Sequence, residues 1–104
     1  MILHTVLLAL EPDADRAELT RIMDGLAALD LEGFKGLNHG PNVDAEGKTP
    51  NFPYGFVCTF TDRAALDRYA SDPGHQALGA RLVALCKGGG DGILVSDIDT
   101  GASP

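Results

Sequence analysis

The residues best suited to chemistry in this sequence are a tyrosine and a histidine six positions apart, Tyr69 and His75. An imidazole with a pKa near ~6.5 can take up a proton at neutral pH. A phenol can donate a hydrogen bond to an oxygen on which negative charge develops. Together they could remove a proton and stabilise an enolate, with His75 as base and Tyr69 as donor. The alternative is structural: Tyr69 packs its ring on a sheet and His75 caps a helix.

Two further titratable residues are candidates for a small-molecule site. His4 lies in an apolar stretch, where a core or pocket histidine is commoner than a base. Asp97 ends a strand that we expect to be buried, and it could orient an imidazole or be solvated. The other residues that we expect to line such a site are Val6, Leu8, Tyr54 and Phe56.

The sequence has no pattern typical of a metal or redox centre. His4, His39 and His75 are widely separated, and neither HxH nor CxxC occurs. We therefore expect no metal and no cofactor, and we expect His39 on the surface. Cys58 and Cys86 are isolated, which favours two buried free thiols in a reducing cytoplasm.

Length and charge limit the class of protein. The chain has 104 residues, enough for one domain, and a formal net charge of -7. This charge repels phosphate backbones and anionic lipids, so we expect neither nucleic acid nor a membrane as partner. No stretch reaches the ~20 apolar residues of a membrane span, and the apolar start lacks the basic leader of a secretory signal. We expect one domain over residues 1–100 and a flexible tail over residues 101–104.

Hydrophobic periodicity predicts the elements around the pair. A strand is expected over residues 52–60, with one face formed by alternate residues: Phe52, Tyr54, Phe56, Cys58 and Phe60. Thr61-Asp62 can cap a short helix over 63–71, with Tyr69 in its last turn. Asp72-Pro73 ends that helix, His75 follows the break, and a second helix is expected over 76–87.

The rest of the chain completes a familiar order of elements. We expect strands over residues 2–10, 34–40 and 91–99, and a loop over 41–50. A helix is expected from about residue 13 to 31, with Asp15 and Glu18 at capping-box spacing. This βαββαβ order predicts an α+β, ferredoxin-like fold with a four-stranded antiparallel sheet.

The sheet needs a second cover. Helices can cover only one face, yet the first strand is apolar on both faces. A sheet-sized apolar patch is rarely left in water, and a second copy related by a two-fold axis is the simplest cover. We therefore expect a homodimer, a dimeric α/β barrel with an enclosed space between the two sheets.

Several short segments carry a resemblance to a known family. These are the opening strand with His4, the segment GPNVDAEGK at residues 40–48, CTFTDRAAL leading to Tyr69 and His75, and the closing ILVSDID. In this order and spacing they resemble the stress-responsive A/B barrel (Dabb) family of dimeric α/β-barrel proteins. The resemblance covers His4 to about Asp99.

The resemblance implies an activity as well as a fold. A plant polyketide cyclase of this family performs an aldol condensation without cofactor or metal, and its catalytic tyrosine and histidine match Tyr69 and His75. A pocket histidine matches His4, whereas Tyr54 stands where that enzyme has another histidine. A cofactor-free cyclase acting on an apolar or aromatic small molecule is the first expectation. The alternatives are a non-catalytic ligand-binding or stress-protective dimer, and a cofactor-independent monooxygenase.

Overall fold

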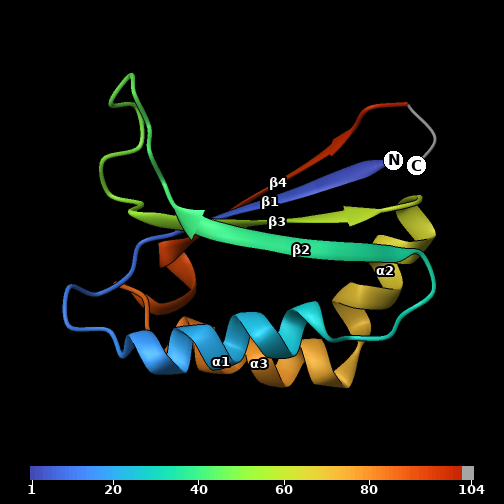
Figure 1. The fold of residues 1–104 in the computed structure, drawn as a ribbon, viewed down its shortest axis with the longest axis horizontal. Coiled ribbons are helices and arrows are strands. Elements are labelled where there is room, and N and C mark those ends of the chain that lie inside the picture. Colours follow the sequence, from blue (N-terminus) through green and yellow to red (C-terminus); the bar gives the residue numbers. More distant parts are fainter. Residues whose placement is uncertain (102–104) are drawn as a thin grey trace.

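In the computed structural model, which describes residues 1–101, one four-stranded antiparallel sheet carries its helices on a single face (Figure 1). The strands are β1 (Ile2–Leu8), β2 (Phe34–Pro41), β3 (Tyr54–Phe60) and β4 (Ile93–Asp99), in the order β2-β3-β1-β4. The helices are α1 (Arg16–Ala27), α2 (Arg63–Ser71), α3 (Pro73–Val83) and the short 3-10 helix η1 (Gly89–Gly92). This confirms the predicted ferredoxin-like βαββαβ fold.

The register of the central strand β1 fixes which residues share a face. His4 lies opposite Cys58 of β3 and Asp97 of β4, and Val6 lies opposite Phe56 and Val95. Because side chains alternate along a strand, Ile2, His4, Val6 and Leu8 point to one face. This face is the one that the helices cover: Ile2, Val6 and Leu8 are buried in a core shared with α1, α2 and α3.

Helix α1 is shorter at both ends than predicted. It begins after Asp15, whose carboxylate accepts hydrogen bonds from the backbone N–H groups of Ala17 and Glu18. The capping box predicted with Glu18 is wrong, because the Glu18 carboxylate instead accepts hydrogen bonds from Nε and Nη2 of Arg81 in α3. This bond, with a smaller contribution from Arg21, lowers the pKa of Glu18 to about 2.

The break between α2 and α3 is sharper than predicted. Asp72 has extended backbone, and its carboxylate accepts the N–H of His75, so it caps a new helix that starts at Pro73. The predicted helix over residues 76–87 therefore starts three residues too late and ends four too late. Proline suits the first helical position because its missing N–H would have no partner there. His75 follows the break, as predicted, but it lies in the first turn of α3 and not before the helix.

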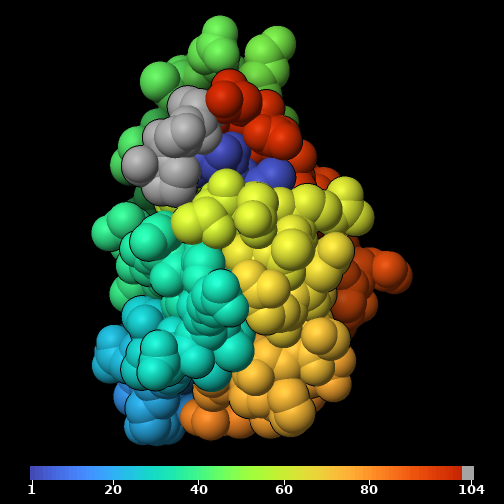
Figure 2. Space-filling model, turned by 90° about the vertical axis from the view of Figure 1, so that its right-hand side faces the viewer, coloured from blue at the N-terminus to red at the C-terminus, as the bar shows by residue number. Residues whose placement is uncertain are grey.

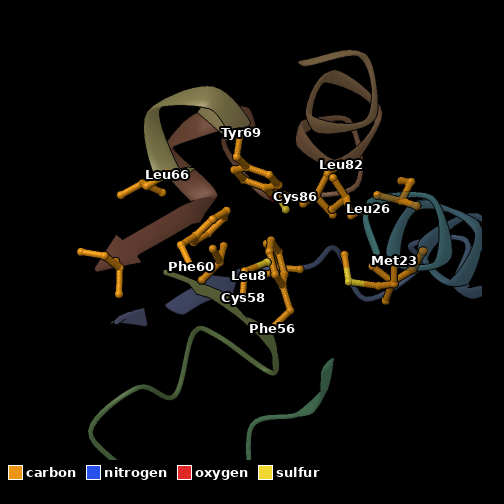
Figure 3. Close-up of a cluster of buried hydrophobic side chains, with 14 of the residues drawn as sticks. Leu8, Met23, Leu26, Phe56, Cys58, Phe60, Leu66, Tyr69, Leu82 and Cys86 are labelled. Atoms are coloured by element: carbon orange, nitrogen blue, oxygen red, sulfur yellow. The ribbon is translucent and has the colours of Figure 1, made fainter. Parts of the chain in front are cut away.

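A continuous apolar core joins the helices to the sheet (Figure 3). Its largest fully buried side chains are Leu8, Ile22, Met23, Leu26, Cys58, Phe60 and Tyr69. Figure 3 shows Tyr69 pointing from α2 into this cluster beside Phe60. Tyr69 is thus part of the core and also, as shown below, of a cavity wall.

The opposite face of the sheet has no helix on it (Figure 1). Leu94 and Ile98 of β4 are 50% and 56% exposed there, and Val57 of β3 is 37% exposed. The prediction that the last strand is buried is wrong, because β4 is an edge strand and only Ile93 is partly covered. Apart from Gly101, the predicted tail lies outside the described residues. None of the helices described is long and apolar enough to cross a membrane.

Candidate functional site

Tyr69 and His75 meet at the junction of α2 and α3. Tyr69 lies in the last turn of α2 and His75 in the first turn of α3, and the turn at Asp72 folds one helix end against the other. Their ring centroids are 4.0 Å apart, with a 37° angle between the ring planes. The capped break between the helices is therefore the device that brings the two side chains together.

The polar atoms of this pair are buried. The Tyr69 hydroxyl and His75 Nδ1 have no hydrogen-bond partner among residues 1–101. Burial raises the pKa of the Tyr69 phenol well above its ordinary value, and the nearby Cys58 thiol adds to the effect. Burial lowers the pKa of the His75 imidazole, although a hydrogen bond to the Ala70 backbone opposes the shift. At neutral pH Tyr69 keeps its proton and His75 is uncharged, so the pair combines a donor with an acceptor.

His4 and Asp97 form a second pair beside the first. His4 Nδ1 lies 2.5 Å from Asp97 Oδ1 across the β1–β4 ladder. An ionised carboxylate can only accept, so Nδ1 donates, and Nε2 of a neutral ring keeps its lone pair. The His4 ring stands edge-on to Tyr69, with centroids 5.7 Å apart. Asp97 thus fixes the orientation of an imidazole that contacts the Tyr69 ring.

Two cavities of about 390 Å³ each share His4, Tyr69 and His75 in their walls. The first opens where the start of β1, the end of β4 and α2 meet; Figure 2 shows this end of the molecule, with the blue and red strand ends next to the yellow α2. The second runs between α3 and the sheet and is largely apolar. The residues added to its wall are Val6, Leu26, Phe56, Gln76, Gly79, Ala80, Leu82, Val83 and Ile93. Both volumes lie in the range of small-molecule pockets, about 300–1,000 Å³.

The three residues expected at the centre of the site do not face the space between two sheets. His4, Tyr69 and His75 all lie on the face that the helices cover, inside one protomer. The open face has a separate hollow of about 310 Å³, and its wall contains none of these three residues. Alternation along a strand shows which residues share a face, but it does not show which face the helices take.

The structure gathers most, but not all, of the predicted ligand-site residues. Val6 and Phe56 line the apolar cavity, and Asp97 lines the other. Leu8 is fully buried in the core and lines neither cavity. Tyr54 also lies outside both, and its hydroxyl is bonded to Nδ1 of exposed His39 at 2.5 Å. Phe56 and Val6 also border the hollow on the open face.

Sequence reasoning did not identify the residues at the rim of the first cavity. Arg63 and Asp67 lie on the exposed side of α2, and Asp99 is the last residue of β4. Each looks like an ordinary solvated charge in the sequence. The strand register places Asp99 beside Ile2, close to α2. Only this arrangement shows that the three charged residues surround one opening. Within residues 1–101 no group of three His, Cys, Asp or Glu side chains could hold a metal ion.

Comparison with known proteins identifies the family. The model of the stress responsive A/B barrel domain (Dabb) matches residues 2–99. The chain belongs to this family. A search of curated proteins finds no significant match.

Solved structures of similar proteins agree with this assignment. A dimeric ferredoxin-like protein of unknown function from Jannaschia sp. CCS1 is 47% identical, with a TM-score of 0.84 over 95% of this chain and 98% of that chain. A Dabb family protein from Mesorhizobium loti is 24% identical, with a TM-score of 0.71 over 94% of each chain. The hydroxynitrile lyase of Passiflora edulis is 16% identical, with a TM-score of 0.76 over 99% and 96%. The last two likenesses concern the fold alone.

Proposed function

We propose that this Dabb protein is a homodimer in which each protomer binds an apolar or aromatic small molecule between its sheet and helices and transfers a proton on it. His75 is the base and Tyr69 the hydrogen-bond donor. His4, held by Asp97, is a polar contact for the ligand, and Val6 and Phe56 are apolar contacts. The reaction is of the cyclase or isomerase type and needs no cofactor.

One observation carries the proposal. The Tyr69 hydroxyl and His75 Nδ1 are buried and lack partners within the described chain, and both residues line cavities of ligand size. A buried polar group without a hydrogen bond costs about 1–3 kcal/mol, so two adjacent ones would be an expensive way to build a core. A bound carbonyl compound would accept the hydrogen bond of the Tyr69 hydroxyl and would place its acidic C–H bond against the lone pair of His75 Nδ1, so a ligand would offset part of this cost.

The chemistry follows from the protonation states. Neutral His75 takes a proton from the carbon next to a ligand carbonyl, and its ring becomes an imidazolium. The electron pair of the C–H bond forms a carbon–carbon double bond, and the π pair of the carbonyl group moves to its oxygen. The protonated Tyr69 hydroxyl donates a hydrogen bond to that enolate oxygen. The enolate carbon then regains the proton from the His75 imidazolium, or it forms a carbon–carbon bond to a second carbonyl group of the same molecule, whose oxygen takes that proton. Either route restores neutral His75. The raised pKa of Tyr69 suits a donor that does not itself ionise.

The homodimer is proposed from the open sheet face. Leu94 and Ile98 leave half or more of their surface in water there, and a second copy of the same face would cover them. The Jannaschia relative is described as dimeric. Cys58 and Cys86 are free and buried, which fits the predicted cytoplasmic location.

Two alternatives remain as outcomes of the test. In a non-catalytic ligand-binding or stress-protective dimer, Tyr69 and His75 would only contact the ligand. In a cofactor-independent monooxygenase, an oxidisable phenol would be consumed together with oxygen. The fold can carry an enzyme, because the Passiflora edulis protein is named a hydroxynitrile lyase, but its low identity transfers no activity to this chain.

The test is exchange of carbon-bound hydrogen. Aryl methyl ketones such as acetophenone are incubated with the protein in D₂O, and deuterium uptake at the methyl group is followed by NMR. We expect uptake above the buffer rate, a loss of about 10²-fold or more in His75→Gln, and a loss of about 10²-fold in Tyr69→Phe. His39→Gln is the matched control, because His39 is exposed and lies outside both cavities.

The other outcomes are informative. Saturable binding without any exchange would establish the non-catalytic alternative. Oxygen uptake with a phenolic ligand would establish the monooxygenase. Equal exchange in wild type, His75→Gln and Tyr69→Phe would overturn the assigned roles.

A further inference from the structure

The opening of the first cavity is surrounded by charged residues of two elements. Arg63 and Asp67 stand on α2, and Asp97 and Asp99 stand on the end of β4. Ile2, Leu66 and Ala70 form the apolar part of the rim. Tyr69 and His75 lie in the wall of the same cavity, so a ligand that enters here passes the charged rim first.

The rim carries more negative than positive charge. Arg63 Nε lies 3.2 Å from Asp67 Oδ1, which pairs the only cation among the lining residues with one carboxylate. Asp97 accepts from His4, a ring that is charged only when protonated. Asp99 accepts from the backbone N–H of Gly101, and no cationic side chain of residues 1–101 pairs with it. Within residues 1–101, neither Asp97 nor Asp99 forms an ion pair with a Lys or Arg side chain.

Beyond the rim, the walls of the two cavities provide no permanently charged group that could compensate an anion for the loss of its hydration shell. Tyr69 is 1% exposed, and its hydroxyl is one neutral donor. His75 is kept uncharged by burial, which lowers its pKa. The second cavity, which shares His4, Tyr69 and His75 with the first, is lined mainly by apolar side chains, and its wall contains no Asp, Glu, Lys or Arg. An ionised group would be desolvated there without a charged partner, which is costly.

We propose that this arrangement selects ligands by charge: the site takes uncharged or cationic carbonyl compounds and rejects carboxylates and phosphates. The inference rests on the proposed function and narrows its substrate class. Carboxylates within about 8 Å of a ligand's path, the Debye length at physiological salt, act on it without full screening. Like charges at a narrow opening lower the local concentration of an anion and raise that of a cation.

The experiment uses three ketones of one shape and different charge. These are 4-methylacetophenone, 4-acetylbenzoate and 4-(trimethylammonio)acetophenone, and their dissociation constants are measured by ligand-observed NMR at low and at physiological salt. We expect the neutral and cationic ketones to bind and the benzoate to bind at least about tenfold more weakly. The difference in affinity between the benzoate and the other two ketones should decrease as the salt concentration rises, because the charges of the rim are exposed to solvent and are screened.

Charge removal tests the rim directly. In the double variant Asp67→Asn/Asp99→Asn the affinity ratio of neutral to anionic ketone should fall by about threefold to tenfold. Asp24→Asn is the matched control, because Asp24 is an exposed carboxylate of α1 outside the rim and should leave the ratio unchanged.

Failure of the inference can be told from failure of the proposed function. If the ketones bind without preference for charge, or the preference survives in the double variant, the selection by the rim is refuted while ligand binding stands. If none of the three binds, the proposed function fails, and the inference fails with it.

Discussion

At the scale of single residues, the site depends on two groups whose protonation states are set by burial. Tyr69 has a raised pKa because its phenol is desolvated beside Cys58. His75 has a lowered pKa because its imidazole is desolvated, against the opposing bond to Ala70. A donor that keeps its proton and a base that is free of one are thus available together at neutral pH. Neither state could be predicted from the sequence, because both depend on how deeply the junction of α2 and α3 is buried.

The state of Tyr69 can be measured optically. The chain has two tyrosines and no tryptophan, so Tyr54→Phe leaves Tyr69 as the only phenol. The folded-state pKa is raised above the unfolded value of about 10, so folding stability is lost as pH rises past that value. We predict that phenolate absorbance in this variant appears only together with the unfolding transition seen by circular dichroism.

Phenolate absorbance in the folded protein would contradict this prediction. It would mean that the Tyr69 hydroxyl has access to water. A stability measurement supplies the control: in Tyr69→Phe the decline of unfolding free energy above about pH 10 should be smaller than in wild type.

At the scale of elements, the sequence predicted the strands better than the helix ends. The period-two run that ends in Phe56, Cys58 and Phe60 made β3 recognisable, and these three residues are buried as a face. The start of α3 was mispredicted because Asp72-Pro73 signals a helix end, whereas Asp72 here also caps the next helix. The same two residues can end one helix or begin the next. The sequence alone does not show that here they do both.

The His4–Asp97 pair is a second feature that could not be predicted from the sequence. The two residues are 93 positions apart, and their contact depends on the register of β1 against β4. Asp97 was a candidate to orient an imidazole, but the sequence could not say which one. The register between strands distant in the sequence is set by the packing of the whole sheet. Side-chain pairs of this kind are therefore visible in a structure but cannot be predicted from residue spacing.

Gly79 of α3 allows the cavity to be tested separately from the stability of the fold. A Cβ at this position would meet no atom within 4 Å, and Gly79 lines the apolar cavity. Replacing a mid-helix glycine favours the helix by about 0.8–1.0 kcal/mol for alanine. We predict that Gly79→Leu raises or preserves thermal stability but weakens ketone binding at least about tenfold, because its side chain occupies ligand space.

Gly79→Ala is the control for this substitution. It gives the helix the same backbone advantage but adds a single methyl group, so ketone affinity should stay close to that of wild type. Unchanged binding in Gly79→Leu would show that ligands do not occupy the space along α3.

At the scale of the whole molecule, the bare sheet face predicts association. Leu94 and Ile98 lie on the open side of β4, whereas Val95 of the same strand points to the helix side and is similarly exposed, at 47%. We predict that Leu94→Glu/Ile98→Glu converts a dimer into a monomer in analytical ultracentrifugation, because buried unpaired charges are costly. Val95→Glu should remain dimeric. A monomeric wild type, or a double variant that stays dimeric, would refute the proposed interface.

The proposed dimer interface and the proposed ligand site lie on opposite faces of one sheet. This separates two roles that the sequence had placed together between the sheets. The open face is available for a second copy, while the helix-covered face holds the cavities and the buried polar atoms. Substitutions that break the interface should therefore affect assembly first and the cavity only indirectly.

The proposed ligand site between the helices and the sheet is tested most directly by a crystal structure of the protein with a bound neutral aryl ketone. We expect electron density for the ring between α3 and the sheet. The carbonyl oxygen should lie within hydrogen-bonding distance of the Tyr69 hydroxyl, with the adjacent carbon facing His75 Nδ1. Density between the sheets of two protomers, or cavities closed by side chains with Tyr69 and His75 bonded to backbone, would contradict this expectation.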